Sequence, residues 1–466
     1  MRDVKYRVET LCLYDYRGVE EHLRAMAARG WWLERAGNRI WKYRRAEPEE
    51  VRYAVTYSVE ASQFNPEPTE GQQSLEELCA AAGWRKVDDW FQMQIFCTRD
   101  PHAVSLETDE GLRLEGIHRA MRKNFLPGNA VALLLSLLMG GAFVGTLFVK
   151  PFRVFERNSS LFSGVLFVLA AALLVYTLWH YYHWRRRSLR SVAEGGGCVP
   201  LGRGYRLVSR VGMAALLALC AIYLALELMT SGRGYALLFL VYMALLFVMV
   251  FLVRGTTVLL KRRGVSKWRN IAGTLAVDVL LAFAMVGVLS WGIIRFGWFL
   301  GGSGERYTYD HTEWDLYPRE DVPLTLSELT GELYEHVSRE WRGEGSFFLP
   351  RWQYWEHVLR EDGGEKERTG LSYTIWQPRM EWLSEALVRD LLEDDRPAGL
   401  PGLRRQYVAE DPVPWGAEAV YRRWLNGKPT ENWLLCFPGR VASLSMDRTP
   451  TAEQMRLAGE RLGAEV

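Results

Sequence analysis

The chain has 466 residues, of which 49% are hydrophobic, and its 57 basic and 55 acidic residues leave a net charge of +2. The charge is unevenly distributed. Residues 121–299 contain 20 basic and 4 acidic residues, whereas residues 1–120 contain 17 and 21, and residues 300–466 contain 20 and 30. Neither end region has the basic surface that DNA or RNA binding requires, so this composition excludes nucleic acid as a partner.

Residues 1–118 alternate between stretches of strand and helix character and predict an α+β domain. Gly30 and Gly83 each follow a helical stretch, where a glycine commonly ends the helix. Ser74 and Glu77 fit a capping box at the start of the second helix. The expected strands are residues 8–14, 31–35, 39–44, 51–59, 84–88 and 91–98, and the expected helices are residues 18–29 and 74–82.

The two halves of this domain resemble each other at a spacing of 53 residues. Each half has the pattern strand–helix–strand–strand. We therefore predict a duplicated unit whose two helices cover one face of an antiparallel sheet. The matching residues are Ala27, Ala28, Gly30, Trp31 and Pro48 in the first half and Ala80, Ala81, Gly83, Trp84 and Pro101 in the second.

Three motifs suggest a family: HLRAMAARGWWL at residues 22–33, the strand residues Trp41, Tyr43, Arg52 and Tyr53, and the segment Ala82-Gly83-Trp84. Together they resemble the bacterial family called domain of unknown function 2812, over about the first 115 residues. Members of that family often carry the domain at the N-terminus, ahead of membrane spans. The family has no established catalytic residues, so the resemblance implies none in this chain.

Trp31 and Trp84 are the candidate ligand-binding residues of this domain. Two indoles at equivalent positions of the two halves could line a cleft for a ligand or a peptide. The alternative is structural, because each indole directly follows a helix-ending glycine and could start the next strand and fill the core. The sequence favours the structural alternative.

Five apolar stretches of about 20 residues follow, at residues 129–149, 161–182, 211–230, 235–253 and 272–294. A helix of this length spans the roughly 30 Å hydrocarbon core of a bilayer. Residues 119–299 are therefore predicted to form a bundle of five transmembrane helices in the lipid bilayer. The glycine-rich segment 195–204 lacks the Lys-Ser/Thr ending of a phosphate-binding loop and is expected to be a flexible linker.

Basic residues set the expected orientation of these spans. The segments before span one, between spans two and three, and between spans four and five contain 17 basic residues, against 6 in the segments on the other side. Because Lys and Arg are retained in the cytoplasm, the N-terminus is expected to be cytoplasmic and the C-terminus extracytoplasmic. We expect a multi-pass protein of the bacterial plasma membrane with a folded domain on each face.

Two acidic residues lie within the spans, and an ionisable residue there is a functional candidate by default. Asp278 lies six residues into the last span, where it could carry protons or ions or could pair with the basic inner boundary. Glu227 lies near the outer end of the third span, close to the headgroups. A structural role is favoured for both, because the spans lack the interruptions and repeats of a proton-coupled transporter.

Residues 300–466 predict a second α+β domain, which is extracytoplasmic in this orientation. A helix is expected from Thr325 or Ser327. The residues that indicate it are Leu329, Leu333, Val337 and Trp341, which recur at every fourth position. Two further helices are expected at residues 382–392 and 450–462, and strands at residues 346–349, 371–376, 433–437 and 441–446.

The candidate binding residues of this second domain are aromatic. Trp352 and Trp355 could stack on sugars of the cell wall, although aromatic residues at this density more often belong to the core. No metal and no cofactor is expected, and no nucleophile elbow or catalytic triad is present, so no catalytic residue is assigned. The histidines that lack the spacing of a zinc motif are His311, His336 and His357.

A folded domain on each face of the membrane favours a non-enzymatic sensor that transmits the state of its outer domain to a cytoplasmic protein partner. A transporter or a transport-accessory subunit is the first alternative, because five spans exceed what a receptor needs and Asp278 lies among them. A cell-surface enzyme that acts on wall or lipid is the second alternative. It is supported only by the acidic and aromatic character of the outer domain.

The expected orientation predicts where two reporter fusions are active. Alkaline phosphatase fused after Gly302 should be active outside the cell, and a fluorescent protein fused after Gly197 should be active inside it, because basic segments stay in the cytoplasm. Enzyme activity and fluorescence of intact cells measure the two fusions. The reverse result, or activity of both fusion points on one side, would contradict the orientation.

Overall fold

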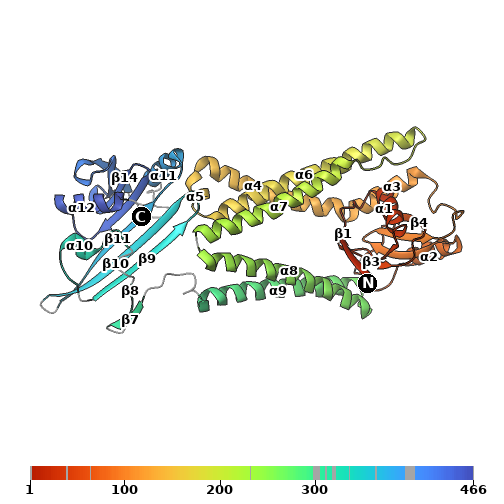
Figure 1. Cartoon of the computed structure of the whole chain (residues 1–466), viewed down its shortest axis with the longest axis horizontal. Helices are drawn as coiled ribbons and strands as arrows, with labels where there is room; N and C mark the ends of the chain where they lie inside the picture. The colour runs from red at the N-terminus through yellow and green to blue at the C-terminus, as the bar shows by residue number, and fades with distance from the viewer. Residues whose placement is uncertain are drawn as a thin grey trace. The chain divides into compact units, whose positions relative to one another are not determined.

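The computed structural model describes residues 3–37, 40–62, 64–230, 232–296, 305–309, 312–316, 322–334, 336–362, 365–393 and 405–464. The chain divides into two compact units, and each combines a sheet-bearing part with segments of long helices (Figure 1). The N-terminal unit comprises Met1–Met139, Leu166–Ala218 and Ala244–Val286. The C-terminal unit comprises Gly140–Val165, Leu219–Met243 and Gly287–Val466.

The N-terminal unit contains two antiparallel three-stranded sheets. Their strand orders are β1-β3-β2 and β4-β6-β5, so the last strand of each half lies in the middle of its sheet. The predicted single sheet is therefore wrong. The first half contains β1 (Val4–Val8), α1 (Tyr16–Ala27), β2 (Trp31–Arg35) and β3 (Ile40–Arg45). The second half contains β4 (Arg52–Tyr57), α2 (Glu70–Ala81), β5 (Arg85–Trp90) and β6 (Met93–Thr98).

The two halves share the register between their last two strands, at the spacing of 53 residues that the sequence indicated. Leu33 pairs with Tyr43 in the first sheet, and Lys86 pairs with Phe96 at the equivalent place in the second. A bulge follows each of these pairs on the same strand. The glycines that end the two helices are also equivalent, because Gly30 and Gly83 have φ angles of 75° and 79°, which a residue with a side chain rarely adopts.

Local expectations in this domain were wrong at two element starts. The first strand ends at Val8 instead of beginning there, and the following residues place the buried side chains of Cys12 and Tyr14 in the core. Helix α2 begins one turn earlier than expected, because Thr69 and Gln72 form the capping box that we assigned to Ser74 and Glu77.

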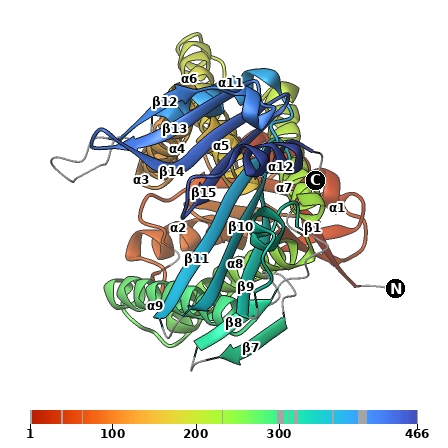
Figure 2. The same cartoon turned by 90° about the vertical axis from the view of Figure 1, so that its left-hand side faces the viewer.

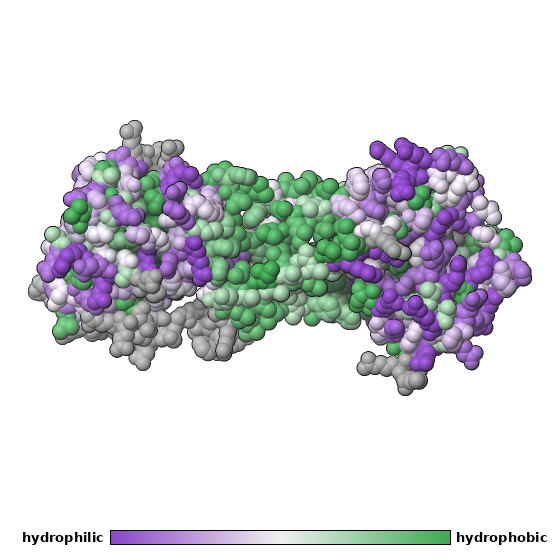
Figure 3. All heavy atoms as spheres, turned by 45° about the horizontal axis from the view of Figure 1, so that its top comes forward, coloured by the Kyte–Doolittle hydropathy of each residue, from purple (hydrophilic) through white to green (hydrophobic). Residues whose placement is uncertain are grey.

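Within the described residues, five helices are long and apolar enough to span a membrane, which confirms the predicted number of spans. They are longer than the predicted apolar stretches, because their polar ends are also helical. Figure 3 shows hydrophobic side chains gathered over these helices. The helical elements of this region are α3 (Glu110–Lys123), α4 (Phe125–Val149), α5 (Pro151–Phe155), α6 (Asn158–Ala193), α7 (Arg203–Thr230), α8 (Gly232–Arg262) and α9 (Lys267–Phe296).

The sheet of the C-terminal unit has nine strands in the order β12-β13-β14-β15-β11-β10-β9-β8-β7 (Figure 2). All neighbours are antiparallel except β8 and β9. The strands are β7 (Glu305–Tyr309), β8 (Thr312–Leu316), β9 (His336–Gly345), β10 (Pro350–Asp362), β11 (Glu365–Trp376), β12 (Arg405–Glu410), β13 (Ala419–Leu425), β14 (Lys428–Phe437) and β15 (Arg440–Met446). The helices are α10 (Leu326–Thr330), α11 (Glu381–Glu393) and α12 (Ala452–Gly463).

The long helix predicted from Thr325 to Trp341 is wrong. Helix α10 ends at Gly331, which adopts a left-handed conformation, and Val337 and Trp341 lie on β9. Residues four apart share a face in a strand as well as in a helix, so the spacing did not distinguish the two. The predicted strand at residues 346–349 is also wrong, because this segment is the turn between β9 and β10.

The two Gly-Trp pairs differ in burial. Trp84 is 3% exposed, and its indole Nε1 donates a hydrogen bond to the carbonyl of Val104 at 2.8 Å. Trp31 is half-buried, and the cationic groups of Lys5 and Arg45 lie 5.1 and 6.0 Å from its ring centre. Loss of the two side chains should therefore have unequal effects.

We expect Trp84→Ala to lower the local free energy of unfolding of the second sheet by about 3–5 kcal/mol, as for other truncations of large core side chains. Trp31→Ala should lower the local free energy of unfolding of the first sheet by less than half of this amount, because the Trp31 ring is already partly in water. Amide hydrogen exchange of β5 and β6, or of β2 and β3, in the full-length protein measures both. Equal protection losses in the two variants would contradict this difference.

Candidate functional site

The structure does not bring the tryptophan candidates together in pairs. Trp31 packs against the main core of the N-terminal domain, whereas Trp84 belongs to a separate cluster under α2. Trp352 and Trp355 lie three residues apart on β10, so their side chains point to opposite faces of the sheet. A platform of two stacked indoles is therefore not formed by either pair.

The two acidic candidates of the spans have different surroundings. Glu227 is buried and lies four residues after Tyr223 on the same helix. Asp278 is half-buried on α9. It lies four and eight residues after Thr274 and Asn270, so the three polar side chains share one face of the helix.

Helix α6 contacts the N-terminal domain through buried aromatic residues. The hydroxyl of Tyr14 and Nδ1 of His180 are 3.0 Å apart, and the hydroxyl of Tyr181 and Nδ1 of His118 are 2.7 Å apart. The rings of Tyr14 and Tyr181 meet edge to face at 5.1 Å, and neither residue is exposed to solvent. We call this contact, together with Glu110 and residues 195–202, the N-terminal junction.

Glu110, at the start of α3, joins three parts of the N-terminal junction. Its carboxylate accepts hydrogen bonds from the Tyr16 hydroxyl at 2.9 Å and from the Cys198 backbone N–H at 3.1 Å. It also pairs with Arg113 at 2.8 Å. Burial acts to raise the pKa of Glu110, but these hydrogen bonds and the nearby arginines outweigh it and hold the pKa below its usual value.

The glycine-rich segment after α6 is packed, so the expected flexible linker is wrong. Trp184 Nε1 donates to the carbonyl of Val199 at 2.7 Å, and Ser191 Oγ donates to that of Gly197 at 2.8 Å. Cys198 is 1% exposed, and burial with the nearby Glu110 charge raises the pKa of its thiol to about 11. Hydrogen-bond donors on α6 thus hold this segment in place, although its glycines alone indicated flexibility.

The N-terminal domain also contacts α9. The side-chain amide of Asn270 donates to the carbonyl of Phe64 at 3.2 Å and to that of Thr257 on α8 at 3.3 Å. The Thr274 hydroxyl donates to Asn270 Oδ1 at 3.2 Å and lies 3.3 Å from that of Thr257. This buried network ties the β4–α2 loop to the α8–α9 hairpin.

In the C-terminal unit, the turn between β9 and β10 docks on the start of α6. The side chain of Asn158, which is 3% exposed, accepts a hydrogen bond from the Phe347 N–H at 3.0 Å and donates to the Thr230 hydroxyl at 2.7 Å. Ser346 Oγ donates to the carbonyl of Phe155 and accepts from the Phe348 N–H at 3.1 Å. We call this contact the C-terminal junction.

Ionic and aromatic contacts extend the C-terminal junction. Arg351 bridges Glu156, just before α6, and Glu344 on β9, with a distance of 2.6 Å to Glu344. Phe155 of α5 meets the rings of Phe348 and Trp382 edge to face at 5.6 and 5.5 Å. Helix α5 is thereby held against α11.

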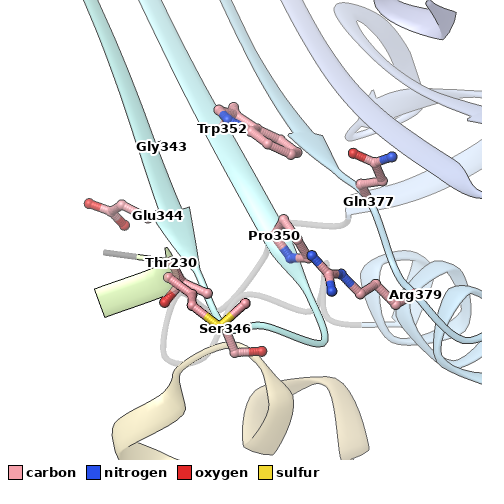
Figure 4. A pocket seen from close by; sticks show the side chains of 9 residues that line it. Thr230, Gly343, Glu344, Ser346, Pro350, Trp352, Gln377 and Arg379 are labelled. Carbon is pink, nitrogen blue, oxygen red and sulfur yellow. The ribbon is translucent and has the colours of Figure 1, made fainter. Parts of the chain in front are cut away.

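A hollow of about 340 Å³ lies beside the C-terminal junction (Figure 4). Trp352, Gln377 and Arg379 contribute side chains from β10 and from the segment after β11. Of the four candidate tryptophans, Trp352 alone lines this hollow. Its full lining is Met229, Thr230, Gly343, Glu344, Ser346, Pro350, Trp352, Gln377 and Arg379.

No group of three or more potential metal ligands is found among the described residues. His311 lies outside them, as does the side chain of His336, and His357 is exposed. The six cysteines are all free thiols, so none forms a disulfide. The absence of an enzymatic activity stays a prediction.

Sequence reasoning missed Asn158, Ser346 and Arg351. Asn158 lies directly before an apolar stretch, where a buried polar side chain is costly without a partner, and this position was a usable signal. Nothing near Ser346 in the sequence indicated that its turn meets a helix end almost 190 residues earlier.

Comparison with known proteins adds one relationship. No curated protein and no solved structure matches the chain. The family model DUF2812, described as a protein of unknown function, matches residues 15–127. This segment runs from just before α1 to the start of α4, and it confirms the resemblance that the Gly-Trp motifs indicated. Over residues 15–127, the chain therefore carries a DUF2812 domain, joined to five candidate membrane spans and a second sheet-bearing domain.

Proposed function

We propose that this multi-pass membrane protein is a non-enzymatic signal transducer of the bacterial plasma membrane. In this proposal, the C-terminal domain lies outside the cell and the DUF2812 domain lies in the cytoplasm, where it passes its state to a protein partner. The orientation rests on the excess of basic residues in the segments assigned to the cytoplasm.

The observation that carries the proposal is that α6 takes part in both junctions. It is one helix of 36 residues without a break. Its first residue, Asn158, is bonded to the turn of the C-terminal domain, and His180, Tyr181 and Trp184 near its other end contact the N-terminal domain or its packed loop. A displacement of α6 at one junction would have to be accommodated at the other.

Polar contacts make both junctions sensitive to such a displacement. A buried donor or acceptor that loses its partner costs about 1–3 kcal/mol, so a small shift of the helix carries a definite free-energy cost. Coupling free energies of this size change a linked equilibrium by about 5–150-fold. Two hydrogen-bonded ends on one helix therefore supply free energies of the size that the proposed transmission needs.

The proposal predicts that damage at the C-terminal junction loosens the N-terminal one. We expect Asn158→Ala to raise the maleimide labelling rate of Cys198 at least about five-fold. Opening the junction exposes this thiol and relieves the burial that raises its pKa. Site-resolved mass spectrometry of full-length protein in nanodiscs measures the rate.

Two controls make the outcome specific. Ser163→Ala alters an exposed α6 hydroxyl that bonds only within the helix, to the carbonyl of Ser160, and should leave Cys198 at the wild-type rate. Cys79, buried in the separate cluster under α2, reports general unfolding and should not change. An unchanged Cys198 rate in folded Asn158→Ala protein would refute transmission through α6.

Ion-coupled transport is the second candidate, and the polar face of α9 is the observation that favours it. Asp278 continues the stripe of Asn270 and Thr274, and burying a carboxylate in a span is costly unless it is used or paired. A transporter needs the ionisable group itself. A transducer needs only a polar group that packs there.

Asp278→Asn separates the two candidates, because it keeps the shape of the side chain and removes its charge. We expect the variant to reach wild-type abundance, to keep the cellular phenotype of the wild type and to leave Cys198 labelling unchanged. Complementation of a deletion strain and quantitative immunoblotting measure the first two. A variant of normal abundance that behaves like the deletion would favour transport.

A further inference from the structure

We propose that the hollow beside the C-terminal junction binds the phosphate group of a membrane lipid from the surrounding leaflet. This inference rests on the proposed function, because it supplies a ligand for the domain that we place outside the cell. The argument uses the charge of the hollow, its apolar wall and its position at the end of a span.

The cationic group that lines the hollow is the guanidinium of Arg379. The Glu344 carboxylate is paired with Arg351 at 2.6 Å, and the same guanidinium also pairs with Glu156. The Arg379 guanidinium is exposed and lies 3.9 Å from the ring centre of Phe347. Among the residues that the structure describes, no carboxylate pairs with Arg379. An anionic group is the ligand that such a guanidinium selects.

The position of this arginine is fixed by its surroundings. Its backbone N–H donates to the carbonyl of Phe348 at 3.1 Å, and that of Gln377 donates to the carbonyl of Pro350 at 3.0 Å. The segment after β11 is thus held along the β9–β10 turn, with the side chain of Arg379 beside Pro350 (Figure 4). The guanidinium offers several N–H donors for phosphate oxygens, and Gln377 adds an amide to the lining.

The wall of the hollow opposite this anion site is partly apolar. Trp352 is paired across the strands with Gly343, and a Cβ atom at position 343 would lie 3.4 Å from the indole. The indole thus lies within van der Waals contact distance of that position. Met229 adds a thioether to the lining. A ligand that combines an anionic head with an apolar body fits both walls.

The position of the hollow favours a lipid over a soluble anion as its ligand. Met229 and Thr230 are the last residues of α7, a helix apolar enough to span a membrane. The end of such a helix lies at the level of the lipid headgroups, where tryptophan is also enriched. A lipid phosphate is already concentrated at this level, and its acyl chains can remain in the bilayer beside α7.

Binding of dihexanoyl phosphatidic acid to the full-length protein in dodecyl maltoside tests the proposal. We expect saturable binding that Arg379→Gln weakens at least about ten-fold, because hydrogen bonds to a charged group are lost. Arg456→Gln removes an arginine of α12 whose side chain is 71% exposed and should bind like the wild type. Titration calorimetry gives both dissociation constants.

Two further probes and a second variant identify the source of the phosphate. Dihexanoylglycerol, which lacks the phosphate, and inorganic phosphate, which lacks the chains, should both bind at least about ten-fold more weakly than phosphatidic acid. Trp352→Ala should weaken phosphatidic acid and leave inorganic phosphate unchanged. Equal affinity for inorganic phosphate would overturn the lipid proposal, as would phosphatidic acid binding that Arg379→Gln leaves unaltered.

The ligand and the transduction proposals fail separately. Binding that depends on Arg379, together with an unchanged Cys198 labelling rate in Asn158→Ala, would refute transmission and leave the lipid site standing. A faster Cys198 rate in Asn158→Ala without binding of phosphatidic acid would refute the lipid site alone. Both measurements use the same full-length protein.

Discussion

A polar group that leaves water must find a partner inside the protein, and this constraint acts on both ends of α6. Asn158 bonds to a backbone N–H and to a hydroxyl. Near the other end, Trp184 and Ser188 bond to the backbone of the loop that follows the helix. Each partner has a fixed direction, so these bonds define how α6 meets each domain more closely than apolar contact would.

The apolar stretches of the spans constrain the positions of the helices much less than these polar contacts do. In the most apolar part of each candidate span, between 6% and 11% of the residues are buried in protein. Most of the surface of these parts is therefore left for lipid. Contacts between lipid-facing side chains gain little from the hydrophobic effect, since the acyl chains are equally apolar. Specific positions of the helices therefore depend strongly on polar residues such as Asn158, Asn270 and Thr257.

Features with a local cause were predictable from the sequence. The spans follow from uninterrupted apolar length, and the ends of α1 and α2 follow from Gly30 and Gly83. The repeat signal also predicted the order of the elements in each half. Long strands such as β9 were missed because Val337 and Trp341 satisfy the helical and the extended spacing equally.

The junctions could not be predicted in the same way, because their partners are distant in sequence. Tyr14 meets His180, and Phe347 meets Asn158, across separations of 166 and 189 residues. No local sequence pattern indicates which loop contacts which helix end. The sequence did mark Trp352 as a candidate, but it could not show that Trp352 and Trp355 would face opposite sides of β10.

The duplication gives the N-terminal domain two equivalent attachment points. The β1–α1 loop carries Tyr14 to α6, and the equivalent β4–α2 loop carries Phe64 to α9. The Tyr57 hydroxyl donates to the carbonyl of Leu13 at 2.9 Å and so links the strand before the second loop to the first loop. A change in the spacing of α6 and α9 would pull on two loops that are themselves hydrogen-bonded. In the proposed transducer, each half would hold one helix, and the core that both halves share would respond to a change in the spacing of the two helices.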